Sequence, residues 1–306
     1  MPKQMPRGLR PILAIGHFVL RALPPRTASD VMAWLLARNS ETFLDTPRIR
    51  ANLHAAFPDL DAAAVDALTV QIAGNFGRLV SEMAHIGAYR DSARGGVIEM
   101  GSPPAPGAAI YVGAHVGAWE MLPAALSRDG CRVTAIYSRN KNPVIDDVLR
   151  RIRPKSGASY VEKAAGLRPC IEALRQGGAI ALLADQRVDS GLEVDFFGRP
   201  TVVTRFPARL AMKFDCPIIP FDVIRVAPGR LRVVFSDPIL PAGRSGAQVE
   251  LELTQKVAAA VEGSVTRNVD SWFCHKSRWK NLPDDRRAPL SAGGEQNPFG
   301  RAPARP

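Results

Sequence analysis

The stretch Ala109-Ile-Tyr-Val-Gly-Ala-His115-Val-Gly-Ala-Trp-Glu120 decides how this chain of 306 residues folds. Its first half is a run of small and β-branched residues, which predicts a buried strand, and a helix-compatible spacing begins just after Gly117. Gly113 and Gly117 permit a sharp turn between the two elements. Pro123 fits only in the first turn of the helix that follows. The stretch therefore predicts an α/β unit with His115 on its connecting turn.

His115 and Glu120 together suit the deprotonation of a hydroxyl group. An imidazole titrates near neutrality, and a neighbouring carboxylate fixes its tautomer and stabilises the cation formed when it accepts a proton. Glu120 falls near a helix N-terminus, where the dipole favours the ionised form, so we expect it to orient His115. The alternative is a histidine at the edge of the core beside a solvated glutamate.

The spacing alone is weak evidence. In a chain with 5 His and 29 acidic residues, the number of such pairs expected by chance is about one half. The same spacing recurs at His54 and Asp59. We interpret that second pair as structural, because a proline breaks the helix-like segment between its members.

The pattern of apolar residues divides the chain into two parts. Residues 28–90 look helical and carry no strand signal, whereas from 97 to 282 short apolar runs alternate with helical stretches. Such alternation favours an α/β sheet with helices packed on it, here as one domain spanning 28–282. The predicted strands are Ala108–Val112, Val133–Tyr137, Ala179–Ala184, Ile218–Val223 and Leu231–Phe235. Residues 283–306, rich in Pro and Arg, are expected to be a disordered tail.

Charge points to an anionic partner. The chain carries 40 Lys and Arg against 29 Asp and Glu, a net charge of +11, which suits nucleic acid, a membrane surface or an acidic protein. Residues 1–27 contain an apolar stretch that His17 and Arg21 interrupt, and it is too short to span a bilayer. A segment lying in the interface of an anionic leaflet is expected there, the alternative being a core helix. The four cysteines are widely spaced and indicate no zinc site.

Two further clusters of polar residues follow predicted strands. Arg139 and Asn142 come after the second strand, and Arg139 suits an oxyanion or a phosphate. Asp185, Gln186 and Arg187 come after the third. Ligands in open α/β sheets bind at such carboxyl ends of strands, although each fragment alone is more often an ordinary loop.

The order of these motifs resembles the bacterial lipid A biosynthesis acyltransferases, the lauroyl and myristoyl transferase family. The resemblance runs from about residue 10 to residue 282. Each motif alone is a weak signal, but the order in which the motifs occur is specific. They are His115-xxxx-Glu120, Tyr137-Ser-Arg139 with Asn142-Pro143, Ala184-Asp-Gln186, Phe196-Phe-Gly198 with Thr204, and Trp272 to Lys280 with Arg278.

The resemblance implies a glycerolipid acyltransferase-like fold, with a mixed central sheet flanked by helices behind an N-terminal helical region. It implies an enzyme that moves a fatty acyl chain from acyl carrier protein or acyl-CoA to a hydroxyl of a glycolipid such as a lipid A precursor. It places that enzyme on the cytoplasmic face of the bacterial inner membrane.

By the same resemblance His115 is the general base and Glu120 its partner, and Arg139 is a catalytic or phosphate-contacting cation. Substrate-binding positions are then Asn142, Asp185, Gln186, Arg187 and Arg278. No cofactor and no metal are expected, and no serine or cysteine lies in a nucleophile elbow.

Two other functions remain open at this stage. A hydrolase would use the same pair to activate water against an acyl ester or thioester. A non-catalytic protein would bind membranes or nucleic acid through its basic surface. The sequence contains no nucleic-acid recognition motif, and nucleic acid is not expected as a partner. For the segment Trp272 to Lys280 we favour tryptophans packed on the core over tryptophans at a membrane interface.

Overall fold

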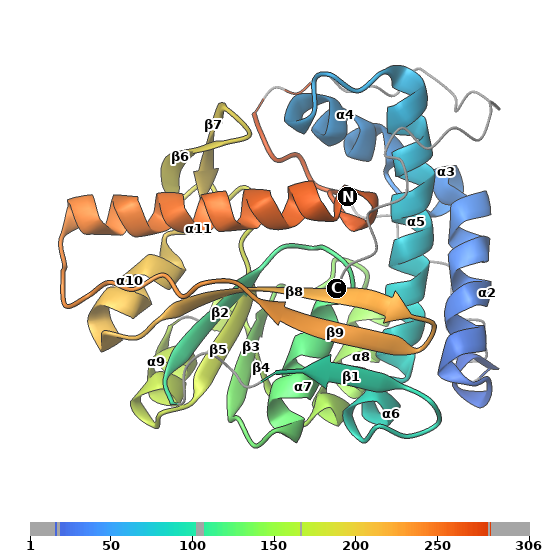
Figure 1. Cartoon of the computed structure of the whole chain (residues 1–306), viewed down its shortest axis with the longest axis horizontal. Helices are drawn as coiled ribbons and strands as arrows, with labels where there is room; N and C mark the ends of the chain where they lie inside the picture. Colours follow the sequence, from blue (N-terminus) through green and yellow to red (C-terminus); the bar gives the residue numbers. More distant parts are fainter. Residues whose placement is uncertain (1–15, 17–18, 102–106, 166, 281, 283–306) are drawn as a thin grey trace.

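The computed structural model describes residues 16, 19–101, 107–165, 167–280 and 282. It shows an α/β molecule with a mixed central sheet flanked by helices and an N-terminal helical region, as predicted (Figure 1). Residues 1–15 and 17–18, which make up most of the segment 1–27, lie outside the described residues. The same holds for the entire tail, residues 283–306. Within the described part, no helix combines the length and the apolar character needed to cross a membrane.

Between Pro25 and Arg90 the structure describes five helices, and the long helix α5 contacts each of the other four. Two aspartates cap helix starts: the side chain of Asp45 accepts from the backbone of Arg48, and that of Asp61 from Ala64. Helix α2 packs along α5 so closely that a methyl group on Gly77 would lie 2.3 Å from the carbonyl oxygen of Met32. The helices are α2 (Pro25–Arg38), α3 (Ser40–Phe43), α4 (Thr46–Ala56), α5 (Ala62–Ala84) and α6 (Ile86–Arg90).

Seven strands form the central sheet in the order β1-β9-β8-β2-β5-β3-β4. Every neighbouring pair is parallel except β8 and β9, so β2, β3, β4, β5 and β8 run one way and β1 and β9 the other. The strands are β1 (Val97–Met100), β2 (Ala109–Gly113), β3 (Val133–Tyr137), β4 (Ser159–Glu162), β5 (Ala179–Leu183), β8 (Ile218–Ala227) and β9 (Arg230–Phe235). A separate hairpin joins β6 (Leu192–Phe196) to β7 (Arg199–Val203).

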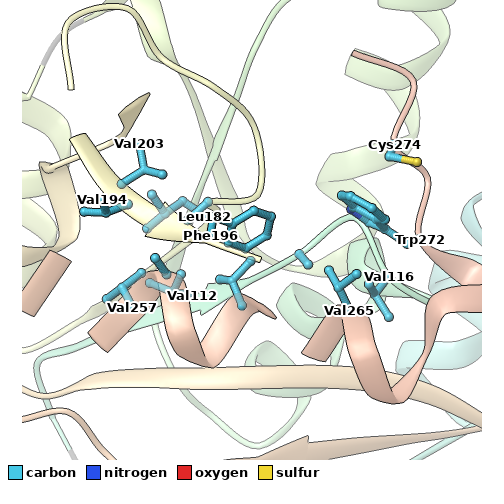
Figure 2. Close-up of a cluster of buried hydrophobic side chains, with 14 of the residues drawn as sticks. Val112, Val116, Leu182, Val194, Phe196, Val203, Val257, Val265, Trp272 and Cys274 are labelled. Atoms are coloured by element: carbon cyan, nitrogen blue, oxygen red, sulfur yellow. The ribbon is translucent and has the colours of Figure 1, made fainter. Parts of the chain in front are cut away.

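Helices cover both faces of the sheet, so its central strands are buried on both sides. Strand β2 is buried at every residue, and its side chains alternate between two apolar clusters. Ile110 and Val112 join the cluster with α9 (Arg168–Arg175), α10 (Phe206–Phe214) and α11 (Ala247–Arg267), part of which Figure 2 shows. Ala109 and Tyr111 join the cluster with α6, α7 (Leu122–Arg128) and α8 (Pro143–Ile152). Helix α5 contributes to both.

A tight turn follows β2 and carries His115. Gly117 adopts φ +62°, and a methyl group at this position would lie 2.3 Å from the carbonyl oxygen of Val223 in β8. The next amide, of Ala118, donates to the same carbonyl at 2.8 Å. A short 3-10 turn, η1 (Trp119–Met121), then leads into α7, and Pro123 lies in the first turn of that helix, as predicted.

Replacement of Gly117 by alanine should lower the free energy of unfolding by about 3 kcal/mol, because the left-handed backbone and the clash with Val223 both disfavour a side chain. Gly130 provides a matched control, because it has φ +82° and open space around its Cα. Gly130→Ala should cost only about 1 kcal/mol. Equal losses for the two variants in urea unfolding would contradict the close approach.

Candidate active site

His115 and Asp185 meet because strands β2 and β5 pair in parallel. Gly113 and Leu183 are partners in this register, and the amide of Ala184 donates to the carbonyl of Gly113 at 2.9 Å. Two residues beyond these partners, the Nδ1 atom of His115 lies 2.7 Å from Oδ1 of Asp185. The chain thus brings an imidazole and a carboxylate together from the ends of two neighbouring strands.

Asp185 is a buried, ionised carboxylate. Burial by itself raises the pKa of this group, but the nearby His115 and hydrogen bonds from His115 and Trp272 outweigh it and hold the pKa at about 2. The indole Nε1 of Trp272 donates to Oδ2 at 3.1 Å, so each carboxylate oxygen has a partner. An ionised carboxylate only accepts hydrogen bonds, so Nδ1 of His115 carries the proton and its Nε2 is the basic nitrogen.

Gln186 and Lys276 lie on the far side of the imidazole. The Nε2 atom of Gln186 lies 3.3 Å from Nε2 of His115, and Nζ of Lys276 lies 2.9 Å from Oε1 of Gln186. An ammonium group only donates, so it fixes the amide oxygen and turns the amide NH₂ group toward the basic nitrogen of His115. The side chain of His115 is 18% exposed, so the ring remains accessible.

Aromatic rings enclose His115 on its other sides. Trp119 meets the imidazole edge to face at 5.1 Å between centroids, and His275 does so at 6.2 Å. His275 in turn stacks on Phe273 at 4.5 Å. Burial, and secondly the proximity of His115, lower the pKa of His275 to about 4, so it is neutral near pH 7. The walls of the site are therefore uncharged rings.

The expectation that Glu120 orients His115 is wrong in its geometry. Glu120 instead forms a two-pronged ion pair with Arg153, with Oε1 to Nη2 at 2.7 Å and Oε2 to Nε at 3.3 Å. Asp185, which contacts Nδ1 of His115 at 2.7 Å, takes the orienting position instead. Arg153 also stacks on Tyr137, with its guanidinium carbon 4.8 Å from the ring centroid.

A cavity of about 50 Å³ lies beside this ion pair, with room for only a few water-sized groups. Its lining is mostly apolar and comes chiefly from η1, α7, β3 and β5, with one residue each from β4, β8 and the turn after α8. The lining residues are Trp119, Glu120, Leu122, Pro123, Ala135, Ile136, Tyr137, Arg153, Tyr160, Ala181, Leu182, Leu183 and Phe221. The cavity shares Trp119 with the wall of the His115 site.

Three of the predicted polar residues are engaged in local structure. Arg139 lies 3.7 Å from Asp146 and 3.5 Å from Glu162, with most of its side chain exposed. The side-chain oxygen of Asn142 accepts from the first amides of α8 and caps that helix. Arg187 pairs with Asp189 at 3.2 Å. None of these three shows a contact with His115, and the substrate role of each stays a prediction.

Arg278 is a buried cation. Its guanidinium carbon lies 4.2 Å from the centroid of Phe196, and Nη1 donates to the hydroxyl of Thr201 at 3.3 Å. Burial lowers its pKa to about 10 despite the proximity of Asp185. Trp272 and Trp279 are buried as well, which confirms the packing interpretation of this segment.

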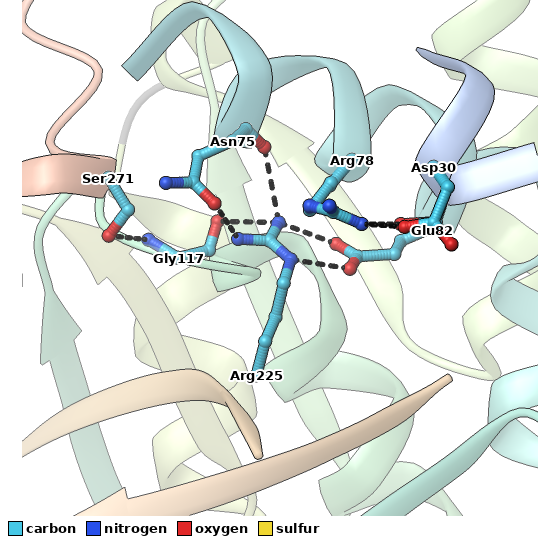
Figure 3. A network of polar contacts seen from close by, with 8 residues as sticks. Asp30, Asn75, Arg78, Glu82, Gly117, Arg225 and Ser271 are labelled. Atoms are coloured by element: carbon cyan, nitrogen blue, oxygen red, sulfur yellow. Dashed lines mark hydrogen bonds and ion pairs between the residues drawn. The ribbon is translucent and has the colours of Figure 1, made fainter. Parts of the chain in front are cut away.

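A partly buried ion pair holds the turn at Gly117, two residues after His115 (Figure 3). Arg225 of β8 donates to Glu82 of α5 at 2.7 and 2.8 Å, and its Nη2 also lies 3.5 Å from the carbonyl oxygen of Gly117. The amide of Gly117 donates to the hydroxyl of Ser271 at 3.2 Å. Helix α5, strand β8 and the C-terminal segment thus hold the same turn.

Sequence reasoning missed Arg153, Trp272 as a hydrogen-bond donor, and Lys276. Arg153 had no signal, because it ends a helix far along the chain from Glu120. Trp272 and Lys276 belong to a segment noticed for its aromatics and cations, but no spacing connects it with position 185. Within the described ranges, no group of His, Cys, Asp and Glu side chains is placed to hold a metal ion.

Trp272→Phe should lower the free energy of unfolding at pH 7 by about 1–3 kcal/mol more than Trp279→Phe does, because only the first change leaves a buried charge short of a donor. The two indoles are similarly buried, and Nε1 of Trp279 has no partner among the described residues. Equal losses in denaturant unfolding would show that the Trp272 hydrogen bond contributes nothing.

The low pKa of Asp185 also predicts a pH dependence. Its folded-state pKa of about 2 lies below the ordinary value of 3.8, so its stabilisation is complete above about pH 4 and is lost as the pH falls toward 2. Thermal unfolding of the wild type should therefore shift downward in that window. Asp185→Asn should start less stable and show a flatter profile between pH 4 and 2.

Comparison with known proteins adds to this geometry. The model of the family described as bacterial lipid A biosynthesis acyltransferase matches residues 5–281. The phosphatidylinositol mannoside acyltransferase of Mycobacterium tuberculosis is 25% identical over 295 residues, covering 90% of each chain. Lipid A biosynthesis acyltransferase 2 of Shigella flexneri is 30% identical over 115 residues, which is 36% of each chain.

Among solved structures, the 1-acyl-sn-glycerophosphate (LPA) acyltransferase of Thermotoga maritima matches with 15% identity. It covers 79% of this chain and 97% of its own, at a TM-score of 0.36, which is too low to support an argument. The family match, in contrast, covers nearly all of the chain. This chain therefore belongs to the bacterial lipid A biosynthesis acyltransferase family and is an acyltransferase of the lipid A and glycolipid type.

Proposed function

We propose that this protein transfers a fatty acyl chain from an acyl thioester to a hydroxyl of a glycolipid, with His115 as general base. One observation carries the proposal: a buried carboxylate, Asp185, holds Nδ1 of an accessible imidazole at 2.7 Å. This arrangement leaves Nε2 unprotonated and able to accept a hydroxyl proton, and the carboxylate stabilises the imidazolium that results.

The reaction then follows in two proton transfers. The acceptor hydroxyl displaces the weakly held amide of Gln186 from Nε2 of His115, which takes the proton as the oxygen attacks the thioester carbonyl. The tetrahedral intermediate collapses with cleavage of the C–S bond, and the thiolate leaves with the proton from His115. An ester and a free thiol are formed, and the imidazole is restored.

Charge develops on the carbonyl oxygen during the attack, and donors beside Nε2 suit its stabilisation. The amide of Gln186 and the ammonium group of Lys276 are next to the imidazole and supply such donors. Glu120 and Arg153 act from behind as positioning residues, because Trp119, which packs on His115, directly precedes Glu120.

The donor and acceptor are assigned by chemistry. A net charge of +11 favours an acidic carrier such as acyl carrier protein, with acyl-CoA as the other thioester donor. The relatives named for lipid A and for phosphatidylinositol mannoside support a glycolipid acceptor. We place the enzyme peripherally on the cytoplasmic face of the inner membrane, since Trp34 and Val31 of α2 are 65% and 46% exposed.

The decisive experiment replaces His115 by alanine. Loss of the base should reduce acyl transfer by about 10²–10⁴-fold, measured as acylated glycolipid by mass spectrometry, with the fold retained. His54→Ala is the matched control, because His54 has the same sequence spacing to an acid but lies exposed on α4. It should leave the rate unchanged.

Two results would sink the proposal. The first is undiminished transfer by a folded His115→Ala protein. The second is release of free fatty acid at the same rate with and without acceptor lipid, which would indicate a hydrolase instead.

A further inference from the structure

We propose that Lys141, Lys163 and Lys276 form a phosphate-binding site at the mouth of the His115 site. The inference rests on the proposed acyl transfer and deepens it, because it assigns a phosphate ester to one of the two substrates. The three lysines come from three separate segments, and none of them was among the residues predicted from the sequence.

The sheet brings the segments that carry Lys141 and Lys163 to the same edge. Strands β5, β3 and β4 are neighbours and parallel, so their carboxyl ends share one edge. The last pair in the register of β3 and β4 is Tyr137 with Glu162, and Lys163 follows directly. Lys141 lies in the loop after β3, and this loop reaches the end of β4, because Arg139 contacts Glu162 at 3.5 Å.

Lys276 joins them from the C-terminal segment. Its Nζ lies 2.9 Å from the side-chain oxygen of Gln186, which follows β5 on the same edge. Burial, then the charge of Lys141 and more weakly that of Lys163, lower the pKa of Lys276, while the charge of Asp185 acts in the opposite direction. All three side chains are exposed to solvent. The mouth therefore gathers three solvent-exposed lysines, and Lys276 is close enough to the other two for their charges to act on it.

Among the described residues, these lysines differ from the arginines nearby in forming no ion pair with a carboxylate. Arg139, Arg153 and Arg187 each pair with a carboxylate. Within the part of the chain that the structure describes, no carboxylate lies within 4.0 Å of the three lysine ammonium groups. Like charges held together without a partner are relieved by an anion that spreads charge over several oxygens. A phosphate ester has that chemistry, and lysine binds phosphate as a point charge.

The lysine site lies close to His115, the proposed base. Lys276 contacts Gln186, and Gln186 contacts Nε2 of His115, so a single side chain separates the lysines from the base. A phosphate bound there belongs either to the head group of the acceptor lipid or to the pantetheine arm of the donor. The two sources share one chemistry, and binding experiments separate them.

The test uses calorimetric titration of the full-length protein with four probes. 4′-Phosphopantetheine and pantetheine represent the donor, and glucose 1-phosphate and glucose represent the acceptor. We expect the phosphorylated member of one pair to bind at least tenfold more tightly than its partner, which identifies the source. The double variant Lys141→Gln/Lys163→Gln should remove this preference and leaves the contact of Lys276 with Gln186 in place. The control Lys213→Gln/Lys256→Gln changes two exposed lysines on α10 and α11 and should keep it.

The outcomes are separable from those of the proposed base. A His115→Ala protein that loses turnover should still prefer the phosphorylated probe. If His115→Ala keeps turnover while the lysine double variant loses the preference, the base assignment fails and the phosphate site stands. Absence of any preference in the wild type, or its persistence in the double variant, overturns the site.

Discussion

The parallel pairing of β2 with β5 is the constraint on which the site depends. The register that joins Gly113 to Leu183 fixes the next residues of both strands within hydrogen-bonding reach, and the imidazole and the carboxylate follow from it. A slip of one residue would turn every side chain of a strand to the other face. Since β2 packs into apolar clusters on both sides, such a slip would also disrupt two cores. The same packing that stabilises the fold therefore sets the geometry of the His115–Asp185 pair.

Ionic interactions in this molecule fall into two groups. Most of the arginines form ion pairs that hold elements of the fold together. Arg225 joins β8 to Glu82 of α5, Arg153 pairs with Glu120, and Arg50 pairs with Glu41 and Asp66. Planar guanidinium groups suit such fixed, two-pronged contacts with carboxylates. Among the described residues, Lys141, Lys163 and Lys276 form no such pair with a carboxylate. Structural charge and charge available for a ligand are thus carried by different residue types.

Much of the fold was predictable from local patterns. The short apolar runs at 133–137 and 179–183 marked strands, and Pro123 marked a helix start. The strand β4 and the hairpin of β6 and β7 were not predicted, because Ser159–Glu162 is too polar and Leu192–Val203 reads as a loop.

The site was predictable in part. His115, Asp185 and Gln186 were identified as candidates, but their contact depends on strand order, which local spacing does not reveal. Glu120 was given the wrong partner because a five-residue spacing says nothing about the direction in which a 3-10 turn points a side chain. Arg153 became visible only once the residue after α8 was placed beside Glu120 and over the ring of Tyr137.

The C-terminal segment has a consequence for how the enzyme matures. Trp272 bridges to Val116, the amide of Phe273 donates to the carbonyl of His115 at 2.8 Å, and Asn52 holds the carbonyl of Cys274. Residues near the end of the described chain thus pack on the turn after β2, which lies more than 150 residues earlier in the sequence. A nascent polypeptide lacking them has its histidine but neither the indole nor the lysine beside it. The surroundings of His115 are therefore complete only once this late segment has folded against the turn.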